Sequence, residues 1–118
     1  MQLLIKCIAI DMDGTLLNSK EKISLANAKA IKKAQSEGIE VIVATGRAYI
    51  EAQHVLQEAD VQCPVISING AVVFDQEGKV IASHPMDKME YRTTREILEQ
   101  LEIYYEIFTN KGILYFTP

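Results

Sequence analysis

Apolar positions in the first part of the chain follow two alternating patterns. Nearly continuous apolar runs, rich in β-branched residues, occupy residues 3–10, 39–44 and 65–68. Such short runs are typical of strands that are buried on both faces of a parallel sheet. Between them, in residues 25–34 and 48–59, apolar residues recur three or four positions apart, which predicts amphipathic helices. The order strand, helix, strand, helix, strand indicates an α/β fold with right-handed crossovers.

The pattern changes after residue 70, where shorter strand-like runs are separated by polar turns. We expect strands at 71–74 and 79–83, a helix at 89–101, and strands at 103–109 and 112–117. The turn between the last two strands is Asn110-Lys111-Gly112, and both strand pairs are predicted to form β-hairpins. These elements belong to an antiparallel α+β unit. We therefore place a domain boundary near Met86, which divides the chain into residues 1–85 and 86–118.

Composition narrows the class of protein. With 118 residues, 48% hydrophobic and 24% charged, the chain has the composition of a globular protein. Its net charge of -4 argues against a nucleic-acid or anionic-membrane partner, and no apolar stretch approaches the roughly 18 residues of a membrane span. Cys7 and Cys63 both lie inside apolar runs, so we expect reduced thiols buried in the core of a cytoplasmic protein.

The candidate chemistry lies at the ends of the three predicted parallel strands. These ends read Asp11-Met12-Asp13-Gly14, Thr45-Gly46-Arg47 and Asn69-Gly70. Ligands of open α/β sheets bind at the carboxyl ends of the strands, where the polar residues would meet. A hydroxyl and free backbone N–H groups at a helix N-terminus favour an anion, most naturally phosphate. Carboxylates beside a phosphate would repel it without a divalent cation, and oxygen ligands suit Mg²⁺.

These segments also resemble a known family. IAIDMDGTLLN followed by VIVATGR resembles the first two motifs of the haloacid-dehalogenase-like phosphohydrolases, and ISINGAVVFD resembles their Cof-like branch. The resemblance implies that residues 1–85 form part of a parallel Rossmann-like core with three strands, two helices and a hairpin. It implies that residues 86–118 begin an α+β cap domain. The activity it implies is Mg²⁺-dependent hydrolysis of a small phosphorylated metabolite.

The resemblance also implies a role for each residue at the strand ends. The nucleophile that forms an aspartyl-phosphate would be Asp11, while Asp13 would act first as general acid and then as general base. Mg²⁺ would be held by the Asp11 carboxylate and the Asp13 backbone carbonyl. The phosphate or the rest of the substrate would be bound by Thr45, Gly46, Arg47, Asn69 and Gly70.

One part of the family pattern is missing from these residues. Members of the family are longer, and after the cap they carry a lysine and a pair of acidic residues that complete the site. We therefore expect this chain to be an N-terminal fragment with weak activity or none on its own. The edge of residues 3–10 would then lack a neighbouring strand, and we expect it to pair with another copy or with the missing C-terminal part.

Two other functions stay open at this point. A non-catalytic truncated product could bind phosphate or a partner chain through the open edge. A sugar phosphomutase would use the same chemistry at its first motif. A haloalkanoate dehalogenase is disfavoured, because Asp13 would have no role in that reaction.

Overall fold

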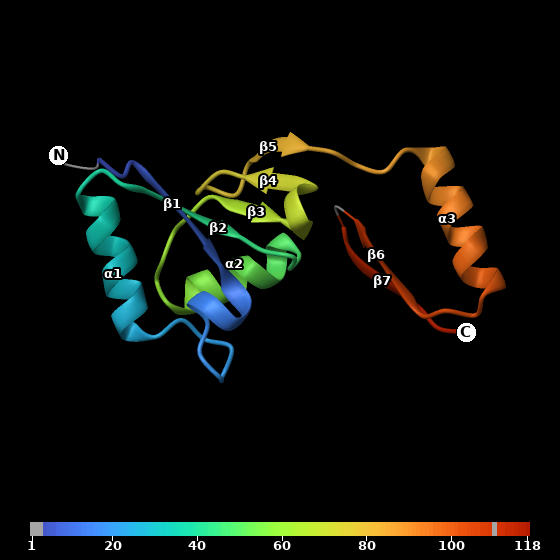
Figure 1. The fold of residues 1–118 in the computed structure, drawn as a ribbon, viewed down its shortest axis with the longest axis horizontal. Coiled ribbons are helices and arrows are strands. Elements are labelled where there is room, and N and C mark those ends of the chain that lie inside the picture. The colour runs from blue at the N-terminus through green and yellow to red at the C-terminus, as the bar shows by residue number, and fades with distance from the viewer. Residues whose placement is uncertain (1–3, 110) are drawn as a thin grey trace. The chain divides into compact units, whose positions relative to one another are not determined.

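The structure, a computed structural model, describes residues 4–109 and 111–118 and divides into two units, Met1–His84 and Pro85–Pro118 (Figure 1). Leu3, at the start of the first predicted strand, and Asn110, in the last predicted turn, lie outside the described residues.

The first unit contains a five-stranded sheet in the order β1-β2-β3-β4-β5. The strands are β1 Cys7–Asp11, β2 Glu40–Ala44, β3 Val65–Ser67, β4 Val72–Phe74 and β5 Val80–Ser83. Strands β1, β2 and β3 pair in parallel, whereas β4 and β5 are added antiparallel as a hairpin. The predicted α/β fold class and the order of its elements are confirmed.

Two helices cover this sheet, and local residues fix where the first one begins and ends. Helix α1 spans Leu25–Ser36 and helix α2 spans Tyr49–Glu58. Ser24 caps α1 by accepting a hydrogen bond from the Asn27 backbone N–H at 3.1 Å. After α1 the chain turns at Gly38, whose φ of +81° favours glycine.

The helices bury only one face of the sheet. Burial alternates along β2, where Val41 and Val43 are buried among α1 and α2 residues, whereas Ile42 and Ala44 are only partly buried. Residues of α1 and α2 belong to one core cluster with these two valines, so both helices pack on the same side of the sheet, as right-handed crossovers require. The prediction that the first strand is buried on both faces is therefore wrong. Strand β1 alternates between exposed and partly buried residues, and among the described residues it pairs only with β2.

The two cysteines differ in exposure, because the helices cover only one face of the sheet. Cys63 is 4% exposed and belongs to the core, as expected, but Cys7 is exposed on the uncovered face of β1. Burial raises the pKa of the Cys63 thiol to about 11. Both thiols are free.

We expect iodoacetamide at pH 8 to alkylate Cys7 and to leave Cys63 unmodified in the folded protein. With a pKa of about 11, only about one thousandth of the Cys63 thiol is ionised at that pH, and burial also blocks access. Intact mass should show one added group, and none in Cys7→Ser. A second group added at the same rate as the first would contradict this.

The second unit is an α+β arrangement of one helix and one hairpin. Helix α3 spans Lys88–Gln100, and strands β6 Tyr105–Thr109 and β7 Gly112–Phe116 pair antiparallel. Asp87 caps the helix, and its carboxylate accepts bonds from the backbone N–H groups of Met89 and Glu90 at 2.7 and 2.9 Å. The predicted helix and hairpin are confirmed. Within the described part of the chain, no helix combines the length and the apolar character needed to span a bilayer.

Candidate functional site

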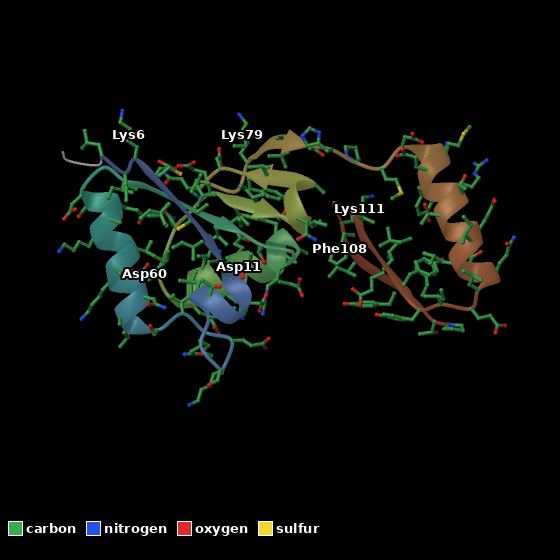
Figure 2. The ribbon with its side chains drawn as sticks, in the orientation of Figure 1. Lys6, Asp11, Asp60, Lys79, Phe108 and Lys111 are labelled. Atoms are coloured by element: carbon green, nitrogen blue, oxygen red, sulfur yellow. The ribbon has the colours of Figure 1, made fainter. Side chains whose placement is uncertain are left out.

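The register of the parallel strands brings the three predicted strand ends together. Asp11 pairs with Ala44, and Ala44 pairs with Ile66, so β1, β2 and β3 finish within one residue of one another. Figure 2 shows Asp11 where β1 runs into the next turn. Beyond the strands, the Asn69 backbone N–H donates to the Thr45 carbonyl at 3.1 Å. The polar residues therefore share one edge of the sheet, as the sequence predicts.

The turn after β1 separates a buried anchor from two exposed acids. This turn, η1, spans Met12–Leu16, and the Leu17 N–H closes it by donating to the Met12 carbonyl at 3.0 Å. The Met12 side chain is fully buried, while Asp11 and Asp13 on either side of it are exposed. Gly14 takes a φ of +76°, which permits the sharp change of direction. Packing of one apolar side chain thus holds both carboxylates at the edge.

A hydroxyl next to Asp11 orients its carboxylate. The Thr15 Oγ1 donates to Asp11 Oδ2 at 3.3 Å. This contact leaves Oδ1 of the same carboxylate as the oxygen that can face a ligand. Thr15 was not among the site residues predicted from the sequence, although its position four residues after Asp11, in the same turn, is compatible with such a bond.

The loop after β2 offers hydrogen-bond donors. Thr45 is 6% exposed, and its Oγ1 accepts a bond from the Arg47 backbone N–H at 3.1 Å, so the hydroxyl proton is directed elsewhere. Gly46 lies against Asn69, and a Cβ at this position would stand 3.1 Å from Asn69 Oδ1. A glycine therefore allows the close approach of the two loops. Gly70, with a φ of +98°, follows in the short turn η2, Ile68–Gly70.

The Arg47 side chain binds an acid of the site. Its Nε donates to Asp13 Oδ2 at 2.9 Å and its Nη2 to Asp13 Oδ1 at 2.6 Å. The same Nη2 also donates to Glu21 Oε1 at 3.2 Å. Hydrogen bonding from Arg47 lowers the pKa of Asp13 below its ordinary value. Asp13 is therefore held in its ionised form at neutral pH in this arrangement.

Glu21 is a residue that reasoning from the sequence missed. It lies in an exposed polar loop, and nothing in the spacing of the motifs relates it to Arg47, which is 26 positions away. The backbone of this loop is held by Asn18, whose carbonyl accepts from the Glu21 N–H at 2.9 Å. Only the folded loop shows that Glu21 reaches the strand edge.

The donor set at this edge is compatible with Mg²⁺. In residues 4–109 and 111–118, no group of three or more His, Cys, Asp or Glu side chains is arranged to hold a metal ion. Mg²⁺, however, commonly uses one or two protein carboxylates and takes its other oxygens from water and substrate phosphate. Asp11 offers its carboxylate, and Asp13 offers a backbone carbonyl while its own carboxylate is paired with Arg47.

Known proteins resemble this chain over nearly all of its length. The family model of the haloacid dehalogenase-like hydrolases matches residues 8–118. The chain belongs to the haloacid dehalogenase-like hydrolase family. The resemblance drawn from the sequence motifs is therefore confirmed.

Three relatives illustrate the similarity. The chain is 44% identical to phosphatase YwpJ of Bacillus subtilis over 113 residues, covering 96% of this chain and 39% of that protein. It is 38% identical to the 5-amino-6-(5-phospho-D-ribitylamino)uracil phosphatase YwtE of B. subtilis, covering 92% and 37%. A haloacid dehalogenase-like hydrolase structure from B. subtilis superimposes with a TM-score of 0.88 at 44% identity, covering 92% and 38%. The chain thus spans less than half the length of these relatives.

Proposed function

We propose that this chain carries the nucleophile and the phosphate-binding loop of a Mg²⁺-dependent phosphomonoester hydrolase that acts on a small phosphorylated metabolite. The observation that supports the proposal best is the meeting of Asp11, Thr45 and Gly46 at neighbouring strand ends. A carboxylate nucleophile beside hydroxyl and amide donors is the arrangement that phosphoryl transfer needs. Family membership and the phosphatase relatives support the same reaction class.

In the first step, Asp11 Oδ1 attacks phosphorus while the bond from phosphorus to the leaving oxygen breaks. Thr15 holds the other oxygen, Oδ2, so the carboxylate is presented in one orientation. The leaving alcohol oxygen takes up a proton, and an aspartyl-phosphate remains on Asp11. Asp13 would supply that proton when protonated.

In the second step, water attacks the aspartyl-phosphate and the bond from phosphorus to Asp11 breaks. The ionised Asp13 carboxylate would take the proton from the attacking water. Hydrogen bonding to Arg47 keeps Asp13 in its ionised form, which is the form from which this step starts. Inorganic phosphate leaves and Asp11 is restored.

The transferred phosphate group would lie on the loop after β2. The Thr45 hydroxyl and the Gly46 N–H would donate to the oxygens of such a group, with Asn69 and Gly70 at the rim. Mg²⁺, when bound, would be held by the Asp11 carboxylate and the Asp13 carbonyl, and would reduce the repulsion between carboxylate and phosphate.

This site alone would work poorly. The described lysines that form ion pairs, Lys22 and Lys32, bind Glu58 and Asp60 rather than Asp11. Without a further cation at the nucleophile, we expect weak turnover by the isolated 118-residue chain.

The free edge of β1 offers backbone groups to which further polypeptide could add a strand. The free thiols suit a reducing, cytoplasmic location.

The test is hydrolysis of p-nitrophenyl phosphate by the complete protein with Mg²⁺ or with EDTA. We expect removal of Mg²⁺ to lower turnover by about 10²-fold or more, because the ion offsets charge that the protein does not balance. A labelled phosphate should be released as inorganic phosphate. A mutase would instead transfer the label to a second sugar. Mg²⁺-independent turnover, or phosphate binding without any turnover, would count against the proposal.

A further inference from the structure

The Arg47 guanidinium is held on Asp13 by complementary geometry. Both carboxylate oxygens of Asp13 are used, one by Nε at 2.9 Å and one by Nη2 at 2.6 Å. Two parallel charge-assisted bonds fix the plane of a carboxylate as well as its position. The side chain of Arg47 is 21% exposed while that of Asp13 is 56% exposed, so the arginine is the better anchored partner.

The backbone of Arg47 is also fixed. Its N–H donates to the Thr45 hydroxyl at 3.1 Å, and its carbonyl accepts from the Ile68 N–H at 3.0 Å. The guanidinium therefore extends from a residue that is tied to β2 through Thr45 and to the loop after β3. Such an anchor can hold the carboxylate of Asp13, which is exposed although the turn that carries it is packed through Met12.

Glu21 is a second acceptor for the guanidinium. Its Oε1 accepts from the same Nη2 at 3.2 Å. The loop that carries it is closed by two backbone bonds of 2.9 Å between Asn18 and residues Glu21 and Lys22, and by a bridge of Leu17 with Ile23. The position of Glu21 is thus set by its loop, although its side chain is largely exposed.

We propose that Arg47 is a positioning residue for Asp13, that Glu21 completes this device, and that the Arg47 guanidinium is not the ligand of the substrate phosphate. The proposal rests on the proposed hydrolase, in which Asp13 handles the proton. Moving Arg47 onto a phosphate would leave two carboxylates unpaired beside a dianion, which like-charge repulsion opposes. Thr45 and Gly46 already supply donors for the phosphate.

The test uses nuclear magnetic resonance of the 118-residue chain without substrate. We expect Glu21→Gln to raise the rate of Arg47 Nε–H exchange with water by about fivefold, as for an exposed ion pair, and Asp13→Asn to raise it by about tenfold or more. Three-bond couplings from Asp13 Cγ should show one χ1 rotamer in the parent chain. They should show averaged rotamers in Arg47→Lys, which keeps the charge but loses the planar pair of bonds.

The matched control is Glu37→Gln, which removes the same charge from a residue that enters none of the ion pairs seen in residues 4–109 and 111–118. It should change neither the exchange rate nor the couplings, and amide signals of β2 should stay in place in every variant. Unchanged Arg47 exchange in Glu21→Gln, or a single Asp13 rotamer in Arg47→Lys, would overturn the proposal.

Addition of inorganic phosphate distinguishes a failure of the positioning role of Arg47 from a failure of the proposed phosphate site. Addition of phosphate should shift the Gly46 backbone amide and leave the Arg47 Nε–H signal unchanged. A shift of the Arg47 Nε–H that follows the phosphate concentration would overturn the positioning role. If the Gly46 amide does not respond to phosphate, the proposed phosphate site is overturned. The positioning role of Arg47 is still decided by the measurements made without phosphate.

Discussion

Asp11→Asn is expected to abolish Mg²⁺-dependent hydrolysis of p-nitrophenyl phosphate by the complete protein, with a loss of about 10⁴-fold or more. The amide has nearly the shape of the carboxylate, so it should keep the turn that Met12 anchors. It carries no negative charge and cannot form the aspartyl-phosphate. Turnover is measured by release of p-nitrophenol, and the covalent intermediate by hydroxylamine-sensitive label on the protein.

Asp60→Asn is the matched control for that experiment. Asp60 pairs with Lys32 at 2.9 Å and its side chain is almost fully exposed. Its φ of +54° is one that asparagine adopts readily. Turnover in this variant should stay within about twofold of the parent, as expected for a change at the surface. If Asp11→Asn retained turnover while remaining folded, the assignment of Asp11 as nucleophile would be wrong.

The sequence predicted the strand ends of the site well, for a physical reason. Asp11, Thr45 and Asn69 each follow a short apolar run, and parallel strands carry their carboxyl ends to one edge. Backbone pairing alone then brings the three together, as between the Asn69 N–H and the Thr45 carbonyl. No knowledge of side-chain conformation is needed for this part of the site.

The contacts of Arg47 could not be predicted in that way. Asp13 and Arg47 are 34 positions apart, and their pairing depends on how far one long side chain reaches across a turn. Glu21 depends in addition on a loop in which its own φ is +57°. Neither the reach of the Arg47 side chain nor the conformation of the loop that carries Glu21 can be predicted from the neighbouring residues in the sequence. The role of Arg47 as a residue near the substrate therefore stays a prediction, and its pairing with Asp13 is a finding of the structure.

Cys7 shows the corresponding limit for the fold. An apolar run marks a strand, but the run does not say whether one or both faces are covered. In the first unit both helices lie on one face, so Cys7 is exposed while Cys63 is buried. Burial was predicted correctly where a residue faces the helices and wrongly where it faces away from them.

Truncation of the buried Met12 side chain is expected to lower the stability of the first unit strongly. We expect Met12→Ala to lower the free energy of unfolding of the first unit by about 2–5 kcal/mol, the usual cost of truncating a large apolar side chain in a core. The Met12 side chain is fully buried and packs in the cluster that contains Val43 and Val65. Urea unfolding, followed through the backbone amide signals of these two valines, measures the change. Met12→Leu, which nearly keeps the volume, should cost less than about 1.5 kcal/mol.

Met89→Ala provides the comparison, because the side chain of Met89 is 77% exposed in the second unit. The same truncation there should change stability by no more than about 0.5 kcal/mol. A similar small change in Met12→Ala would show that the turn is not anchored by this side chain. A large loss of stability in Met12→Ala would link the fold to the site directly. Met12 lies between the two acids, so the packing that stabilises the sheet also fixes where Asp11 and Asp13 emerge from it.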